Sequence, residues 1–536
     1  MNRSAPILCT VLAVAALAAC SKRDVATAAP PAPPATTALA APADGGIAWV
    51  RAASDAEVDA AFARARGEGK PVFVYWGAKW CPPCNQLQAT LFNRQDFIER
   101  SRAFVAVYVD GDKPGAQKLG TRFAVRGYPT MVVFDRGGQE LTRLPGEVDA
   151  QQYNEVLTLS MSAQRSAKAV LAQARAGGQG LVEADWRLLA YYSWETDQQQ
   201  LAGAGGVAPL LRELAQACPA AHADSAMRLR LKALAATDSQ AGPVADAAAQ
   251  RAPVLALLAD AAQSRRHMDV LTNSAAGLAG ALSAAGSAER KALLAAFGSA
   301  LVGLQADSSL SRADRLMALV ARVQLSQLEA PGQDKTAATP AALRTEVRDL
   351  AARFDREITD GYERQAVITT AAWALEQAGL MDDSDALLQA NLAKSHSPYY
   401  LMADLADNAK KRGDKAAALD WNAQAFDKSE GPATRLQWGA RYLGMLVELS
   451  PQDAPRVERV AAQLFDEAAA MPDAFEARSG RSLQRIGGHL SGWAKGGAHG
   501  DVMKRLQRQL DAVCAKLPAG DSRTLCDGVL KPGSSA

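Results

Sequence analysis

The stretch Trp80-Cys81-Pro82-Pro83-Cys84 decides the fold of the N-terminal part of this chain. It follows an apolar run, residues 71–76, that predicts a strand, and it precedes a pattern typical of a helix. Two cysteines separated by two residues at the start of a helix are typical of dithiol–disulfide chemistry. Because helix amides stabilise a thiolate at the first cysteine, we expect Cys81 to be the reactive, solvent-facing thiol and Cys84 the buried one.

A cysteine pair at this spacing also occurs in zinc sites and in structural disulfides. A zinc site needs a second Cys or His pair at comparable spacing, and the five His residues are scattered beyond residue 220. A purely structural disulfide is the other alternative, although so short a ring constrains little unfolded-chain entropy. We therefore interpret Cys81 and Cys84 as a redox-active disulfide, and we expect no metal and no further cofactor.

Residues 47–160 resemble a thioredoxin-like domain, of the branch that includes the periplasm-facing reductase domain of the bacterial membrane electron transporter. The residues that carry the resemblance are Trp49, the helical stretch 55–66, Gly69 to Val72, Trp80-Cys81, the strand 104–110, the loop Gly127-Tyr128-Pro129-Thr130 and the strand 131–134. The resemblance implies that Pro129 is cis and packs beside the dithiol. It also implies that Trp80 and Tyr128 shape the substrate-docking surface, that Cys81 forms a mixed disulfide, and that Cys84 resolves it.

The sequence departs from the family at two positions. Many thioredoxins carry a buried Asp six residues before the first motif cysteine, where this chain has Tyr75, and the Lys that often accompanies it is replaced by Ala106. The proton of Cys84 then has to move through water, Tyr75 or the substrate, or the domain has little turnover.

The N-terminus predicts export. Asn2-Arg3 and the apolar stretch 5–19 are typical of a signal peptide (residues 1–19), since the stretch is too short to span a bilayer. Leu17-Ala18-Ala19-Cys20 resembles the bacterial lipoprotein box, which implies lipidation of Cys20, and plain secretion is the alternative. Residues 20–46 are rich in Pro and Ala and predict an extended linker. We therefore expect a periplasm-facing protein of the cell envelope, anchored by lipid to the outer membrane.

Residues 165–536 predict a large all-α domain, because Ala and Leu dominate and apolar residues recur at helical spacing. Lys394-Ser-His-Ser-Pro398 recurs 34 residues later as Lys428-Ser-Glu-Gly-Pro432, which is the tetratricopeptide period. Residues 364–450 therefore resemble tetratricopeptide units, and a generic array of helical hairpins is the alternative. The aromatic residues of this part either line a concave binding face or belong to the core.

The remaining cysteines fit an oxidising compartment. Cys514 and Cys526 are close in sequence, with Pro518 and Gly520 between them, and we expect them to form a structural disulfide. Cys218 is left over and is interpreted as a small buried apolar residue, and a thiol–imidazole pair with His222, one helical turn later, is the alternative.

The formal net charge of +2, from 59 basic and 57 acidic residues, gives no reason to expect nucleic acid as a partner. The sequence predicts an α/β thioredoxin-like domain followed by an all-α domain, acting as a thiol–disulfide oxidoreductase. Its expected partners are envelope proteins with thiols or disulfides, an upstream electron donor or acceptor, and the membrane through the lipid anchor. The direction of the reaction stays open. The alternative is a non-catalytic binding or adaptor lipoprotein in which the helical domain carries the function.

Overall fold

The computed structural model describes residues 46–197, 200–237, 242–332 and 335–531. The predicted signal peptide, Cys20 and almost all of the predicted linker lie outside the described residues. The described part of the chain belongs to one compact unit, in which the N-terminal α/β domain and the helices that follow pack against each other.

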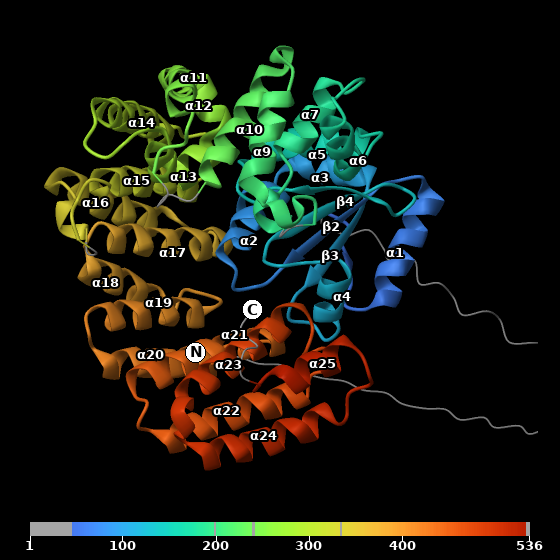
Figure 1. Ribbon diagram of the computed structural model, residues 1–536, viewed down its shortest axis with the longest axis vertical. Coiled ribbons are helices and arrows are strands. Elements are labelled where there is room, and N and C mark those ends of the chain that lie inside the picture. Colours follow the sequence, from blue (N-terminus) through green and yellow to red (C-terminus); the bar gives the residue numbers. More distant parts are fainter. Residues whose placement is uncertain (1–45, 198–199, 238–241, 333–334, 532–536) are drawn as a thin grey trace, which may run out of the picture. The chain divides into compact units, whose positions relative to one another are not determined.

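A five-stranded sheet forms the centre of the N-terminal domain, in the order β1-β3-β2-β4-β5 (Figure 1). Its strands are β1 (Val50–Arg51), β2 (Val72–Gly77), β3 (Val105–Asp110), β4 (Thr130–Phe134) and β5 (Glu140–Leu144). β3 runs parallel to β1 and β2, whereas β2 with β4 and β4 with β5 are antiparallel. The central strand β2 is buried at every position, as expected for a strand with helices on both faces.

Alternate residues of β2 face two different cores. Val74 and Trp76 pack with the apolar faces of α1 (Asp55–Glu68) and α4 (Ala116–Arg122). Phe73 and Tyr75 face the opposite core, which contains α2, α3 and α5. The bounds of these elements are α2 (Pro82–Leu87), continued by the π-helical turn η1 (Gln88–Phe92), α3 (Gln95–Arg100), with the 3₁₀ turn η2 (Ser101–Ala103) after it, and α5 (Ala150–Ser162). Tyr75 therefore lies on the face of the sheet that carries the cysteine motif.

Local sequence explains where the first helix begins and ends. Ser54 caps α1 through its side chain, and Glu57 returns a bond to the backbone of Ser54, which completes a capping box. Gly69 ends the helix at φ 65°, a left-handed conformation that glycine adopts without a steric penalty. The strand β2 follows three residues later and delivers the chain to the cysteine motif.

The rest of the described chain is helical, which confirms the predicted fold class. The helices are α6 (Ala167–Arg175), α7 (Glu183–Ala190), α8 (Trp194–Asp197), α9 (Val207–Ala217), α10 (Ala223–Ala235), α11 (Ala247–Ala259), α12 (Ala261–Arg266), α13 (Met268–Leu282), α14 (Ala288–Ala306), α15 (Arg312–Gln327), α16 (Ala341–Glu357), α17 (Gly361–Gln377), α18 (Met381–Asn391), α19 (Pro398–Lys411), α20 (Lys415–Lys428), α21 (Pro432–Leu449), α22 (Ala454–Ala469), α23 (Ala477–Trp493), α24 (Gly500–Cys514) and α25 (Asp521–Gly528). None of the helices in the described ranges combines the length and the apolar character needed to cross a bilayer.

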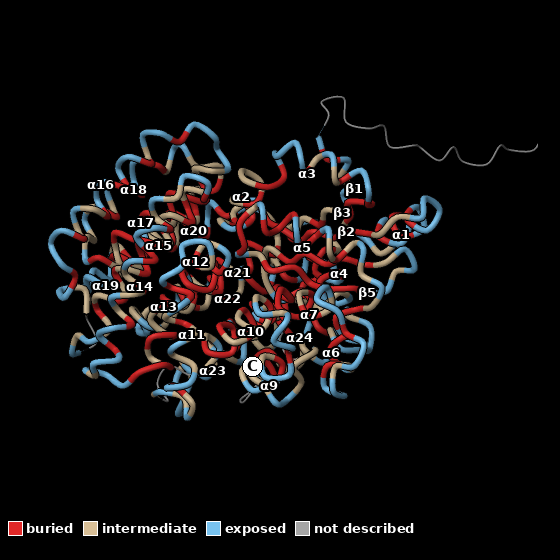
Figure 2. The backbone as a smooth tube through the Cα atoms, turned by 90° about the horizontal axis from the view of Figure 1, so that it is seen from above, coloured by how far each residue is buried: buried red, intermediate tan, exposed pale blue. Residues whose placement is uncertain are grey.

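The 34-residue offset corresponds to equivalent positions of every second helix. Gly379 and Gly413, which follow α17 and α19, have φ values of 76° and 79°, and Pro398 and Pro432 each begin a helix. Consecutive helices pack in pairs, and buried stretches alternate with exposed ones along each of them (Figure 2). The structure thus shows stacked helical hairpins in residues 361–469, and the tetratricopeptide assignment stays a prediction.

The helical region contacts the thioredoxin-like domain at several places. α17 packs against α2 and η1, and α23 packs against α4 (Figure 1). The side chain of Gln86 on α2 donates to Asp314 on α15 at 2.9 Å. Helices from the middle and from the end of the chain therefore lie around the cysteine motif.

Candidate redox site

Cys81 and Cys84 form a disulfide at the start of α2, with a Cα–Cα distance of 5.2 Å. β2 ends at Gly77, and the turn that follows places Cys81 at the N-cap of α2, where its Sγ accepts a hydrogen bond of 3.2 Å from the amide of Cys84. Pro82 and Pro83 occupy the first two helical positions, where a missing N–H leaves no intrahelical bond unmade. The local geometry is that of a dithiol whose first sulfur faces the amides of a helix start.

The loop before β4 lies at the same end of the sheet. The Tyr128–Pro129 peptide bond is cis, and Thr130, the next residue, pairs with Trp76 near the end of β2. The loop that the resemblance assigned to substrate docking is thereby brought to the strand end from which the cysteine motif begins.

The expectation that Cys81 faces solvent is wrong for this structure. Cys81 is 2% exposed and Cys84 is 3% exposed, so that the two sulfurs differ little in burial. The physical reason is that α17 packs over α2, and that helices α19, α21 and α23 surround the preceding residue, Trp80. A motif of five residues carries no information about what distant helices cover it.

Trp80 makes its contacts with the helical region of its own chain. Its indole N–H donates to the hydroxyl of Thr434 at 2.7 Å. Its ring stacks on Tyr400 with centroids 6.0 Å apart and meets Trp438 edge-on at 6.1 Å. The guanidinium of Arg478 lies over the same ring, 5.4 Å from its centroid. Trp438 is 5% exposed, so these aromatic residues form an interface between the two regions rather than an open face.

Asp112, in the turn after β3, contacts residues of two helices at this interface. Its carboxylate accepts from the backbone amide of Thr434 at 2.7 Å and from the Thr434 hydroxyl at 2.6 Å. It also forms an ion pair of 3.1 Å with Arg478, whose guanidinium lies 4.9 Å from the ring centroid of Tyr128. Trp80 and Tyr128, predicted to dock substrate, are thus both in contact with Arg478.

A cavity of about 260 Å³ opens beside Cys84, and it contains a carboxylate that the sequence analysis did not single out. Tyr75, Tyr108 and Asp110 line it together with Cys84. Asp110 is aligned with Gly77 in the register of β3 against β2, at the strand end that leads to the motif. Burial raises the pKa of the Asp110 carboxyl above its ordinary value, and burial raises the pKa of Tyr75 well above 10.

The residues that line this cavity show which group beside Cys84 can accept its proton. Tyr75 keeps its proton at neutral pH, since its pKa is raised, and it stacks on Tyr108 with centroids 5.3 Å apart. Asp110 is the carboxyl group that shares the cavity with Cys84. The sequence contained a signal for Asp110, because alternate residues of a strand share a face, which places Asp110 on the face of Tyr108. Tyr108 pairs with Tyr75 of β2, so that all three side chains lie on one face of the sheet.

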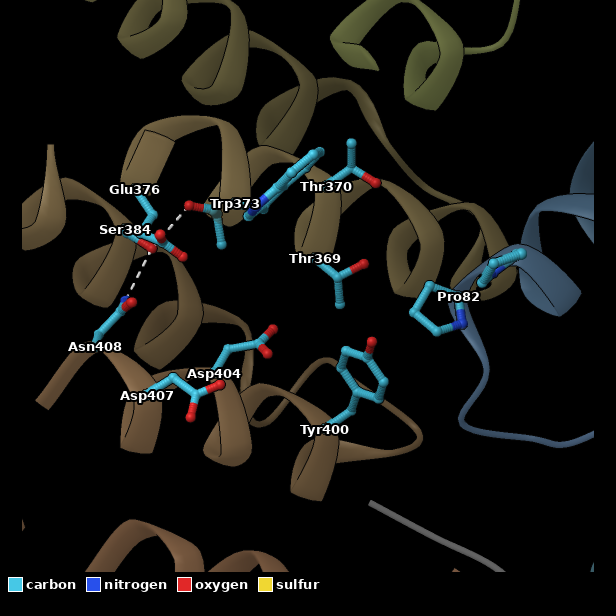
Figure 3. A pocket seen from close by; sticks show the side chains of 12 residues that line it. Pro82, Thr369, Thr370, Trp373, Glu376, Ser384, Tyr400, Asp404, Asp407 and Asn408 are labelled. Carbon is cyan, nitrogen blue, oxygen red and sulfur yellow. Dashed lines mark hydrogen bonds between the residues drawn. The ribbon is translucent and has the colours of Figure 1, made fainter. Parts of the chain in front are cut away.

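A second cavity, of about 280 Å³, borders the two prolines between the cysteines. Figure 3 shows Tyr400, Asp404 and Asp407 of α19 and Thr369, Thr370 and Trp373 of α17 around this cavity, with Pro82 at one side. Burial raises the pKa of Asp404 to about 7. The side chain of Trp373 is 37% exposed, which is unusual for a residue of its size.

The remaining predicted site residues lie away from this motif or outside the described chain. Cys514 and Cys526 are joined by a disulfide, with Cα atoms 5.6 Å apart, which ties the end of α24 to α25. Cys218 is free and buried, and burial raises the pKa of its thiol to about 11. Among the described residues no group of three His, Cys, Asp or Glu side chains is arranged to hold a metal ion. Cys20 lies outside the described residues.

Comparison with known proteins identifies the N-terminal domain. Residues 58–159 match the family model of the thioredoxin-like domain. Thiol:disulfide interchange protein DsbD 1 of Pseudomonas aeruginosa is 32% identical over 106 residues, which are 19% of this chain and 18% of that protein. The corresponding protein of Klebsiella pneumoniae is 31% identical over 112 residues, 20% of this chain and 18% of its own length. The chain therefore spans about a fifth of the length of the curated relatives that it matches.

Solved structures of thioredoxins are also similar to about a fifth of the chain. A thioredoxin from Thermus thermophilus is 28% identical, with a TM-score of 0.18, and covers 20% of this chain and 83% of its own. Thioredoxin O2 from Arabidopsis thaliana, in the oxidised state, is 24% identical with a TM-score of 0.19. The family-model match and the Cys81–Cys84 disulfide show that this chain contains a thioredoxin-like domain with a CxxC pair, and the comparisons concern about a fifth of its length.

Proposed function

We propose that this protein catalyses thiol–disulfide exchange on proteins of the bacterial envelope, through Cys81 and Cys84. The observation that supports the proposal is the disulfide at the start of α2, at the same end of the sheet as the cis-Pro129 loop. The two cysteines are three positions apart, so the disulfide between them can form and reopen locally by thiol–disulfide exchange.

In the reducing direction, the Cys81 thiolate attacks a disulfide of the substrate. One substrate sulfur leaves as a thiolate and takes up a proton, while the other is held on Cys81 as a mixed disulfide. The Cys84 thiolate then attacks the Sγ of Cys81, and the second substrate thiol is released. Two electrons and two protons pass from the dithiol to the substrate, and the Cys81–Cys84 bond is restored. An upstream thiol or disulfide protein returns the pair to its starting state, and oxidation is the reverse sequence.

Asp110 accepts the proton of Cys84 in this scheme. It lines the cavity beside Cys84, and its raised pKa brings its basicity closer to that of a thiol than an exposed carboxylate would be. It thereby takes the part that the buried Asp plays in many thioredoxins, from the neighbouring strand rather than from the position of Tyr75.

The envelope location rests on the sequence of the N-terminus. We propose that the protein is anchored through a lipidated Cys20 and that the Pro- and Ala-rich residues 20–46 tether the folded part. Replacing Cys20 by Ala should shift the protein from the membrane fraction to the soluble fraction. Wild-type protein that is soluble and carries an unmodified N-terminus contradicts the anchor.

The test of the catalytic proposal is covalent trapping in cells with Cys84→Ser. Without the resolving thiol, substrates should stay on Cys81 and migrate as complexes that a reductant releases, and mass spectrometry identifies them. The matched control is Cys218→Ser, which removes a buried thiol outside the motif and should trap nothing. If Cys84→Ser traps no more protein than the Cys81→Ser/Cys84→Ser double variant, the protein does not exchange disulfides with envelope proteins.

One observation favours a second function, that of a binding or adaptor protein. Trp80 and Cys81, which would meet a substrate, are covered by the helical region. If the helical region covers Cys81 permanently, the reduced Tyr400→Ala/Thr434→Val variant should be alkylated at Cys81 at the same rate as the reduced wild type. If the cover opens, these substitutions remove contacts of Trp80 and should accelerate alkylation, which favours the enzyme.

A further inference from the structure

A third cavity next to the cysteine motif has a composition unlike that of the other two. It measures about 530 Å³ and lies between the two regions of the chain. Trp80 and the loop residues Gly127 and Tyr128 form one wall, and residues of α21 and α23 form the other. The cavity therefore begins at the residues that immediately precede Cys81 and Pro129.

Basic side chains dominate this cavity. Arg126, Arg478, Arg481 and Arg485 line it, together with His489. Among the described residues, Asp112 is the one carboxylate that forms an ion pair with any of the four guanidinium groups, and its partner is Arg478. Three guanidinium groups thus face the cavity without a carboxylate partner in the described chain, and no acidic side chain lines it.

Arg481 and Arg485 of α23 each donate to a neutral acceptor. Arg481 donates to the backbone carbonyl of Arg126 at 2.8 Å, and Arg485 donates to the Ser482 hydroxyl at 3.0 Å. Arg478 is 8% exposed, and its Nε is buried without a hydrogen-bond partner. Arg481 and Arg485 are more exposed than Arg478, and because their acceptors are neutral, each guanidinium can pair with a negatively charged ligand.

The arginines that line the cavity repel one another, which also favours binding of an anion. Burial and the neighbouring Arg126 lower the pKa of Arg481, and burial and Arg478 lower the pKa of Arg485. Since an arginine keeps its charge at neutral pH even so, the cavity holds an uncompensated positive charge. Its walls exclude part of the solvent, which strengthens the attraction for an anion.

The spacing of the basic residues indicates an elongated ligand. Arg478, Arg481, Arg485 and His489 follow one another at intervals of three and four residues, on one face of α23. From Arg478 to His489 the helix rises eleven steps, or roughly 16 Å, which is the length of about five residues of extended peptide. A single small anion would contact only part of such a row.

We propose that this cavity binds an acidic segment of the protein substrate, next to the cysteine that reacts with Cys81. The carboxylates of the segment pair with Arg481, Arg485 and Arg126, and its chain leaves the redox motif along α23. This inference rests on the proposed thiol–disulfide exchange and deepens it, since it names the chemistry that selects the substrate.

The test compares three peptides that contain the same disulfide, flanked by Asp and Glu, by Asn and Gln, or by Lys. Wild-type protein should reduce the acidic peptide with a kcat/KM at least about tenfold higher than that of the amide peptide, and the lysine peptide should be the poorest substrate. The preference should weaken as the salt concentration rises. The double variant Arg481→Gln/Arg485→Gln should lose the preference.

A matched control removes the same charge elsewhere. Arg505→Gln/Arg508→Gln changes two arginines of α24 that do not line this cavity, and it should keep the preference of the wild type. The proposal is overturned if the wild type shows no preference, or if the Arg481/Arg485 variant keeps it.

Binding without chemistry separates this inference from the proposed function. Fluorescein-labelled peptides in which Ser replaces both cysteines should bind the wild type in the same order, measured by anisotropy. If these peptides bind with the acidic preference but no disulfide peptide is turned over, the proposed function fails and the site stands. If inorganic phosphate binds as tightly as the acidic peptide and displaces it, the cavity is a small-anion site and the proposal is wrong.

Discussion

The thioredoxin-like domain and the helical region each contain one disulfide, and the two bonds differ in what surrounds them. Cys81 and Cys84 are three positions apart, at a helix start bordered by cavities. Cys514 and Cys526 are twelve positions apart, and both are buried in a continuous apolar core with side chains of α21 to α24. Both pairs are buried, so burial does not separate them. The cavities beside the short Cys81–Cys84 ring are the difference, and they suit a bond that is made and broken.

The reacting cysteines and the residues that control access to them belong to different regions of the chain. The two reacting cysteines lie within one short segment, but Trp80 beside them is covered by Thr434, 354 positions further along the chain. The thioredoxin-like domain thus supplies the reactive pair, and the helical region determines what can reach it. The four predictions that follow test this division.

The largest effect is expected for Cys81→Ser. The substitution removes the attacking sulfur, so that turnover of a disulfide substrate should fall on the order of 10³-fold or more. Steady-state reduction of a disulfide peptide measures the effect. Cys218→Ser, which changes a buried thiol far from the motif in sequence, should leave the rate unchanged. Turnover that survives in Cys81→Ser places the chemistry somewhere else in the molecule.

The Cys514–Cys526 disulfide should contribute to stability and not to the exchange reaction. Replacing Cys514 and Cys526 together by Ser should leave the exchange rate unchanged and lower the free energy of unfolding by about 3 kcal/mol, as expected for closing a loop of this length. Chemical denaturation followed by far-UV circular dichroism measures the loss. The comparison is made in a Cys81→Ser/Cys84→Ser background, so that the other disulfide contributes to neither protein. Equal midpoints for both proteins contradict a structural role.

The next effect concerns the proton of Cys84. Asp110→Asn removes the carboxylate from the cavity beside Cys84, and decay of the mixed disulfide at pH 7 should slow roughly 10- to 100-fold. Above about pH 9 the difference should shrink, because Cys84 then loses its proton to solvent. Asp59→Asn, on the exposed face of α1, is the control and should decay like the wild type. A pH-independent loss in Asp110→Asn indicates damage to the fold rather than a missing proton acceptor.

Much of the thioredoxin-like domain is predictable because its signals are local. The apolar strand 71–76, the CxxC motif and Pro129 each predict structure from neighbouring residues, and the helical character of the second region follows from its periodicity. The exposure of Cys81 was predicted wrongly, because burial there depends on the packing of α17, and no local pattern encodes that contact. Asp110 was missed for a related reason, since its proximity to Cys84 arises from strand pairing between β2 and β3.

The smallest effect is expected for Asp404, which lines the cavity of Figure 3. The prediction asks whether this carboxylate lowers the free energy of unfolding. Burial is the main cause that raises the pKa of Asp404 to about 7, and the nearby Asp407 and Glu376 raise it further, whereas Arg441 and Lys411 lower it. The folded state therefore binds the Asp404 proton more tightly than the unfolded state, whose Asp pKa is near 3.9.

The sign of the pH effect follows from this difference. Asp404 costs no stability below about pH 4, and it lowers the free energy of unfolding increasingly as the pH rises from about 4 to about 7. Asp404→Asn should consequently raise the stability at pH 8, on the order of 1 kcal/mol because solvent reaches the cavity, and leave it nearly unchanged at pH 4. Asp407→Asn should not stabilise, because Asp407 forms an ion pair with Arg441. Thermal unfolding at both pH values measures these differences. If Asp404→Asn gains nothing at pH 8, the neighbouring Arg441 and Lys411 compensate the Asp404 carboxylate, and the prediction is wrong.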